Sequence, residues 1–194
     1  MRKWVYLLTV CLAASAVGQA ATEDRYAEWT RVKVGDRVPD FTYTTLSGVK
    51  VASDQLEGKV LLINFFATWC GPCRAEMPHL EALFKKTKHR DFAMIAIGRE
   101  HSAEDLLAFK REHTLTLPLA PDAERKIYGL FAEKYIPRNI VIGKDRIVKW
   151  HSVGYTATTF AEMQSVIMRE LARDPEKDKT ASQRHTAEQP NAGS

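Results

Sequence analysis

The stretch VLLINFFATWCGPCRAEMPHL, residues 60–80, decides the fold of this chain. Its first part is a continuous apolar run that ends at Phe66, which is typical of a strand buried on both faces of a sheet. The residues after this run place Cys73, Met77 and Leu80 at helical spacing on one face. We therefore expect a buried strand that turns directly into a helix, with Cys70 at the helix N-terminus.

Cys70 and Cys73 are the only cysteines expected in the mature chain, and two residues separate them. A bridge between them closes a very short loop, and the entropic gain from a disulfide grows with loop length. A purely structural disulfide is therefore a poor explanation. A structural zinc site needs about four ligands, and the sequence has neither a second CxxC nor a spaced pair of histidines. A reactive pair of thiols is the favoured interpretation.

The predicted helix N-terminus explains why these thiols would react. Unpaired amide donors and the positive end of the helix dipole stabilise a thiolate. Pro72 fits the first turn, where its missing N–H is not needed. We expect Cys70 to be exposed and to attack a substrate disulfide. We expect Cys73 to be more buried and to resolve the mixed disulfide that forms.

Strands alternate with helices along the rest of the chain. This order predicts an α/β fold of three layers, with a mixed central sheet, helices on both faces and an N-terminal hairpin at residues 41–51. Further strands are expected at 92–97, 115–120, 138–142 and 147–151, and helices at 102–113, at 122–130 and from a capping box at Thr159 and Glu162 onward.

The two ends of the 194-residue chain differ from this central pattern at residues 35–172. Residues 1–20 combine a basic start, an uncharged apolar run and a small-residue cleavage site, which indicates an export signal that includes Cys11. We expect a flexible lead-in at 21–34 and a disordered tail at 173–194. The net charge is +4, and two of these charges come from Arg2 and Lys3, so nucleic-acid binding is not expected.

Trp69-Cys70-Gly71-Pro72-Cys73, between a strand and a helix, resembles the active-site motif of the thioredoxin superfamily. The flanking residues resemble its exported TlpA/ResA-like branch, and the resemblance covers about residues 35–172. It implies that Pro78 interrupts the first helix and that Pro137 is a cis-proline. The backbone of Ile136 would then face the cysteines and pair with a substrate. The substrate-binding residues implied in this way are Trp69, Gly71, Pro72, Ile136 and Pro137.

The resemblance also draws attention to Glu76, which in this branch lies near the cysteines and affects their ionisation. Thioredoxin has a buried acidic residue on the preceding strand, and this chain has Asn64 there. Asparagine cannot accept and release a proton, so Glu76 is the candidate for that role, although it could also be a solvated charge on the helix. The four histidines expected to be solvated at the surface are His79, His101, His113 and His151.

Taken as a whole, the resemblance implies an exported thiol–disulfide oxidoreductase, located in the periplasm or at the outer face of the cytoplasmic membrane. It would be a monomer and would need no cofactor or metal, because the cysteine pair carries two electrons. Its partners would be oxidised substrate proteins and a membrane-embedded thiol reductant. Reduction is favoured over oxidation, for example of apocytochrome c before haem attachment. The alternative is a carrier that binds copper(I) through both thiolates.

Overall fold

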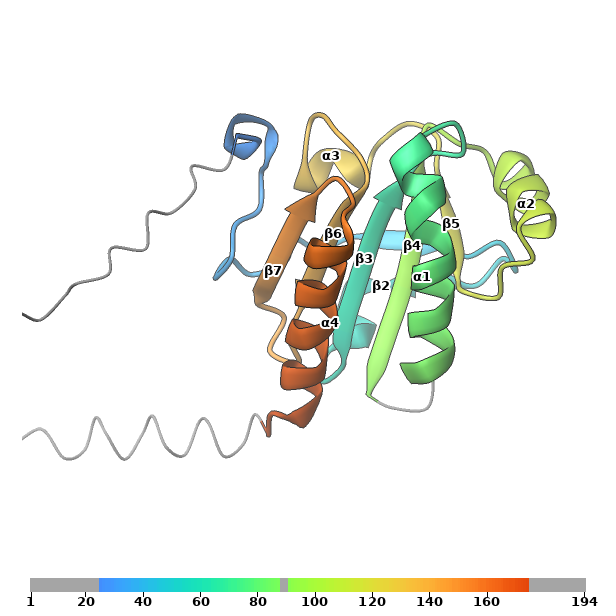
Figure 1. The fold of residues 1–194 in the computed structure, drawn as a ribbon. Coiled ribbons are helices and arrows are strands. Elements are labelled where there is room, and N and C mark those ends of the chain that lie inside the picture. Colours follow the sequence, from blue (N-terminus) through green and yellow to red (C-terminus); the bar gives the residue numbers. More distant parts are fainter. Residues whose placement is uncertain (1–24, 88–90, 175–194) are drawn as a thin grey trace, which may run out of the picture.

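Figure 1 shows the computed structural model, which describes residues 25–87 and 91–174. Five strands form one sheet in the order β5-β4-β3-β6-β7. Strands β3, β4 and β5 are parallel, whereas β6 is antiparallel to both β3 and β7. The sheet is therefore mixed, as predicted. Its strands are β3 (Val60–Phe66), β4 (Phe92–Arg99), β5 (Leu119–Asp122), β6 (Arg138–Ile142) and β7 (Val148–Val153).

The sheet is covered on both faces, which gives the three predicted layers. One core contains side chains of three helices: α1 (Gly71–Thr87), α2 (Ala103–Glu112) and α4 (Ala157–Ala172). In Figure 1, α1 and α4 lie in front of the sheet and the hairpin lies behind it. The hairpin of β1 (Thr42–Thr44) and β2 (Lys50–Ala52) joins the second core, together with the single-turn helix α3 (Tyr128–Phe131). Two 3₁₀ turns, η1 (Ala27–Trp29) and η2 (Ser53–Leu56), complete the described elements.

Strand β3 lies at the centre of the sheet, and all seven of its residues are buried. Successive side chains of a strand point to opposite faces. Accordingly, Leu62 and Phe66 belong to the core under α1, whereas Ile63 and Phe65 belong to the core under the hairpin. Asn64 is in phase with Leu62 and Phe66, so this polar side chain points toward α1.

The short strand predicted at 115–120 begins later, at Leu119. The reason lies in α1, where the carboxylate of Glu81 accepts hydrogen bonds from the N–H groups of Thr116 and Leu117, both at 2.9 Å. These amides are therefore satisfied by a side chain and not by a neighbouring strand. Pro118 follows them and has no N–H to offer.

The helix predicted at 122–130 is reduced to α3. Asp122 ends β5, and its carboxylate accepts hydrogen bonds from the N–H groups of Ile127 and Tyr128 at 3.1 and 2.7 Å. This side chain caps a helix that begins six residues later. The segment between them is consequently a loop.

The last helix begins earlier than the capping box predicted at Thr159 and Glu162. Thr156 is the N-cap of α4, and its hydroxyl accepts the N–H of Thr159 at 3.1 Å. The Thr159 hydroxyl accepts the N–H of Thr156 in return, also at 3.1 Å. Thr159 therefore completes a capping box as its third helical residue instead of starting one.

Part of the expected flexible lead-in packs against the domain. Thr30 forms a β-bridge with Ala132, Arg31 donates to the carbonyl oxygen of Gly129 at 2.7 Å, and Val32 is buried in the second core. The predicted export signal at 1–20 and nearly all of the predicted tail at 173–194 lie outside the described residues. Within the described ranges, no helix is long and apolar enough to cross a membrane.

Candidate active site

The two cysteines form a disulfide at the start of α1. Their Cα atoms are 5.3 Å apart, and the backbone N–H of Cys73 points at Cys70 Sγ from 3.3 Å. This is the amide environment predicted for a helix N-terminus, and such a donor stabilises a thiolate at Cys70. Cys73 is 1% exposed, as expected for the inner residue. The prediction that Cys70 is exposed is wrong for this oxidised form: it is 6% exposed and belongs to the core under α1.

The loop before β6 faces the disulfide, because Arg138 pairs with Phe65 and both segments therefore lie at the same end of the sheet. The Ile136–Pro137 peptide bond is cis, as the resemblance implied. The carbonyl oxygen of Ile136 lies 3.9 Å from Cys70 Sγ, a distance at which the thiol of the reduced form can donate weakly. Pro137 is buried, and its carbonyl oxygen accepts the N–H of Gly154 at 2.8 Å. The loop is thereby joined to the turn after β7.

The other predicted substrate-binding residues surround the disulfide on the solvent side. Gly71 and Pro72 are exposed in the first turn of α1, and Trp69 is 65% exposed just before it. Trp69 also lines a hollow of about 310 Å³ whose opposite wall is α2, with Asp105 and Glu112 among its residues. An exposed indole next to a reactive disulfide offers a contact surface for a polypeptide substrate. Pro78 lies inside α1, as expected.

Glu76 is the buried carboxyl group of the site and not a solvated charge on the helix. It is 1% exposed. Its Oε1 accepts a hydrogen bond from Asn139 Nδ2 at 2.6 Å, and its Oε2 accepts one from Asn64 Nδ2 at 3.0 Å. Burial raises the pKa of Glu76 to about 7, while the hydrogen bonds from the two asparagines act in the opposite direction. Glu76 is one helical turn beyond Cys73, so the two side chains share a face of α1.

The pair of asparagines follows from the register of the sheet. Asn64 and Asn139 are direct partners in the antiparallel ladder between β3 and β6, and Asn64 Nδ2 donates to Asn139 Oδ1 at 2.8 Å. Both side chains therefore point to the face of the sheet that α1 covers, where they contact Glu76. The special position of Asn64 was predicted from the sequence, whereas that of Asn139 was not. A polar residue directly before the apolar residues of RNIVI was a possible signal, but its partner depends on the strand register.

His101 is not the solvated surface histidine that was predicted. It is 7% exposed, and its Nε2 accepts the backbone N–H of Thr68 at 2.9 Å. Thr68 lies two residues before Cys70, so this histidine contacts the turn that carries the cysteines. Burial lowers the pKa of His101, although Asp105 and Glu100 act in the opposite direction.

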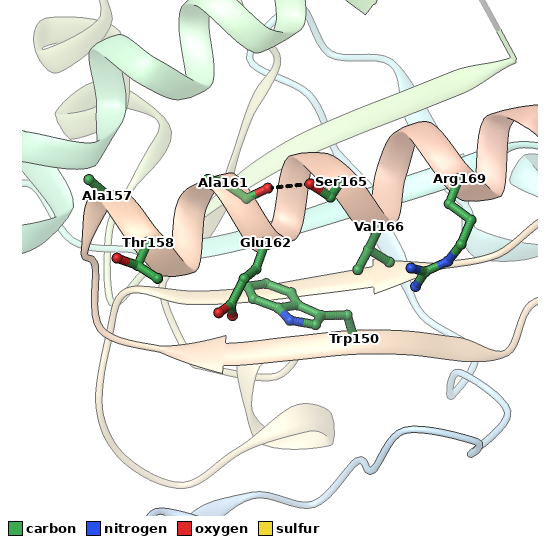
Figure 2. A pocket seen from close by; sticks show the side chains of 8 residues that line it. All are labelled: Trp150, Ala157, Thr158, Ala161, Glu162, Ser165, Val166 and Arg169. Atoms are coloured by element: carbon green, nitrogen blue, oxygen red, sulfur yellow. Dashed lines mark hydrogen bonds between the residues drawn. The ribbon is translucent and has the colours of Figure 1, made fainter.

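A larger hollow of about 770 Å³ lies elsewhere, between β7 and α4 (Figure 2). Trp150 forms its floor, and Glu162 and Arg169 project over it from α4. The hydroxyl of Ser165 donates to the Ala161 carbonyl oxygen of its own helix at 2.9 Å. Neither cysteine lines this hollow. In the part of the chain that the structure describes, no group of three or more His, Cys, Asp or Glu side chains could hold a metal ion.

Comparison with known proteins agrees with this geometry. The sequence matches the AhpC/TSA family over residues 34–151. The chain belongs to this family. Within it, the chain is similar to the thiol-disulfide oxidoreductase ResA of Bacillus cereus, with 31% identity over 141 residues that cover 73% of this chain and 80% of the relative. ResA of Halalkalibacterium halodurans is 26% identical over 170 residues, which cover 87% of this chain and 97% of that protein.

Solved structures of thioredoxin-like proteins superpose on this AhpC/TSA family member. A putative protein disulfide isomerase from Bacteroides thetaiotaomicron matches with a TM-score of 0.73 and 33% identity, over 77% of this chain and 97% of its own. A putative thiol:disulfide interchange protein DsbE from Chlorobium tepidum matches with a TM-score of 0.65 and 25% identity, over 73% of this chain and 99% of its own. The chain is therefore a thiol–disulfide oxidoreductase of the ResA/DsbE type, with a CxxC disulfide and a thioredoxin-like fold.

Proposed function

We propose that this protein is an exported reductase of protein disulfides, in which Cys70 attacks and Cys73 resolves. The observation that carries the assignment of roles is the environment of Cys70 Sγ. This sulfur receives the N–H of Cys73 from the helix N-terminus and lies beside the carbonyl oxygen of Ile136. Cys73 is buried more deeply than Cys70, so an incoming disulfide reaches Cys70 first.

In the proposed reaction the reduced protein supplies two electrons. The Cys70 thiolate attacks one sulfur of the substrate disulfide, forms a mixed disulfide and releases the other substrate sulfur as a thiolate. Cys73 then attacks Cys70 Sγ, which forms the Cys70–Cys73 disulfide and releases the second substrate sulfur. The substrate gains two electrons and two protons, and the enzyme ends in the oxidised form. A membrane-embedded thiol reductant would return it to the dithiol form.

Glu76 is proposed to take the proton from Cys73 before the resolving step. A group with a pKa of about 7 is present in both protonation states near neutral pH, so it can accept a proton and release it again. The two asparagines below it hold both carboxylate oxygens in place. Since Asn64 stands where thioredoxin has an acid, Glu76 is the carboxyl group available to this site.

The substrate is proposed to lie across Trp69, Gly71 and Pro72 on one side of the disulfide and Ile136 and Pro137 on the other. The first three are exposed, and the backbone of Ile136 faces Cys70. An extended peptide next to the cis-proline loop can pair with its backbone in the manner of an added strand. The resemblance to the ResA-like branch supports apocytochrome c thiols, kept reduced outside the cytoplasm for haem attachment, as the substrates.

The redox potential of the Cys70–Cys73 couple tests the proposed direction. We expect equilibration against glutathione or dithiothreitol to place it near or below about −200 mV, where reducing members of the fold lie. A potential near that of the oxidant DsbA, about −120 mV, would rule out the reductase. The substrate can be identified separately, by trapping mixed disulfides with Cys73→Ser in the native cell envelope. Cys70→Ser is the matched control, and it should trap nothing and reduce no insulin.

A further inference from the structure

A buried histidine holds the turn that leads into the reactive cysteines. Residues 67–70 form a turn closed by the N–H of Cys70, which donates to the carbonyl oxygen of Ala67 at 3.1 Å. The amide of Thr68, the second residue of the turn, points away from that hydrogen bond and donates to His101 Nε2 at 2.9 Å. His101 lies just beyond β4, 33 residues further along the chain.

This contact requires one particular form of the imidazole. Because Nε2 accepts a hydrogen bond, it carries no proton, and the proton of the neutral ring is on Nδ1. Nδ1 lies 4.0 Å from Asp105 Oδ2. That carboxylate is itself held by the N–H and the hydroxyl of Ser102, at 2.9 and 2.7 Å. The neutral form is the one that burial favours, since burial lowers the pKa of His101.

The charged groups that act on the ring come from two directions. Asp105 faces it from the first turn of α2, and Glu100 precedes it in the chain; both favour the protonated ring. Glu100 is also paired with Arg99 and Arg125, at 3.0 and 3.6 Å, which offsets its negative charge. The turn presents the uncharged amide of Thr68. Protonation of Nε2 would place two N–H donors against each other and break this contact.

We propose that His101 is a positioning residue for thiol–disulfide exchange: its neutral imidazole holds the turn before Cys70, and its protonation releases that turn. The turn sets the direction of the exposed Trp69 side chain and the place of Cys70 relative to Ile136. Errors of about 1 Å in a reacting geometry can cost about a hundredfold in rate. A released turn therefore lowers the rate of exchange without removing either cysteine. The kinetic part of this inference rests on the proposed reductase function.

Three variants separate the hydrogen bond from the bulk of the ring. His101→Gln keeps an acceptor at the place of Nε2 but does not titrate, whereas His101→Leu has no acceptor. His79→Gln, at an exposed position of α1, is the control. The first readout is the amide resonance of Thr68 in the oxidised protein, followed by NMR between pH 4.5 and 8. We expect it to titrate with the His101 ring, below the ordinary histidine value of about 6.5, and not to titrate in His101→Gln.

The second readout is the kcat/KM of disulfide reduction across the same pH range. The ratio of wild type to His101→Gln cancels the ionisation of the cysteines, which both proteins share. We expect a ratio near one at pH 7.5 that falls roughly tenfold once the ring is protonated, and a His101→Leu variant that is slower by roughly tenfold throughout. The ratio of wild type to His79→Gln should stay level.

Several results would overturn the inference. These are a Thr68 amide that does not titrate, an identical titration in His101→Gln, a level wild type to His101→Gln ratio, or a His101→Leu variant as fast as His101→Gln. If His101→Leu fails to fold, the amide titration and the ratio decide the matter. If the wild-type protein reduces no disulfide, the proposed function fails, and the Thr68 titration still decides whether His101 controls the turn.

Discussion

Replacement of Glu76 by glutamine should remove one pH dependence from the stability of the oxidised protein. Burial raises the pKa of Glu76 from 4.5 to about 7 in the folded state. Between these two values, the folded protein holds one proton that the unfolded chain has released. The stability that this proton supplies is fully present below pH 4.5, and it is lost as the pH rises through 7.

The size of the effect follows from the two pKa values. From 4.5 to about 7 is a difference of 2.5, and at about 1.36 kcal/mol for each pKa unit this corresponds to roughly 3 kcal/mol of unfolding free energy. Glu76 is 1% exposed, so solvent screening does not reduce this figure appreciably. One proton changes the free energy of unfolding by at most about 1.4 kcal/mol per pH unit.

The assay is urea unfolding of wild type and Glu76→Gln in the oxidised form, at intervals from pH 4 to 8.5. The disulfide keeps the thiols from titrating, and subtraction of the two curves cancels every other group. The stability of wild type minus that of the variant should decrease by roughly 3 kcal/mol between the two ends. Glu162→Gln, at an exposed position on α4 (Figure 2), is the matched control. The difference in unfolding free energy between wild type and this variant should not change with pH.

A level difference for Glu76→Gln, or one that increases with pH, would refute the reasoning. The first result would mean that Glu76 ionises equally in the folded and unfolded states. The second would mean that the two asparagines stabilise the carboxylate by more than burial destabilises it. In either case Glu76 would be fully ionised at neutral pH and could not pass a proton in the way proposed.

Three further predictions concern the surroundings of the site. Asn139→Ala removes a hydrogen bond that lowers the pKa of Glu76, so the pH-dependent loss of stability should move to higher pH; an unmoved curve would contradict the role of the amide. Glu81→Ala leaves two amides before β5 without their acceptor and should lower the unfolding free energy by about 2–4 kcal/mol, measured in urea. Gly98→Ala should cost roughly 1–3 kcal/mol, because its Cβ would lie 2.6 Å from a side-chain carbon of α2. Gly129→Ala, with nothing within 4 Å of the added carbon, is the control, and equal effects at both glycines would count against tight packing of α2.

The features that could be predicted correctly are those that neighbouring residues determine together. The apolar run of β3, the turn and the first helical face are contiguous, so their spacing alone indicated a strand that leads into a helix with Cys70 at its start. The start of the helix expected from residue 102 is equally local, because the hydroxyl of Ser102 accepts the N–H of Asp105, three residues further on. The cis peptide bond before Pro137 was predicted from the family resemblance, because the residue pattern around it does not distinguish cis from trans.

β5 and α3 were predicted too long because a side chain from another element binds backbone N–H groups at or near their start. Glu81 takes the amides that would have started β5 at residue 115, and Asp122 takes those that would have extended α3. Propensity and periodicity describe a segment in isolation, so they overestimate elements whose amides are bound by another part of the chain. The mistaken exposure of Cys70 has a different cause, since its side chain packs into a core built from several helices.

The sequence by itself determined the chemistry of this protein, because a CxxC pair at a helix N-terminus is a property of one contiguous stretch. Only the tertiary structure decided how that chemistry is controlled. Asn139 meets Glu76 across 63 residues, and His101 meets Thr68 across 33. Such contacts depend on strand register and on the packing of helices against the sheet. The pKa values that they influence depend on burial, which the complete fold creates and no local pattern contains.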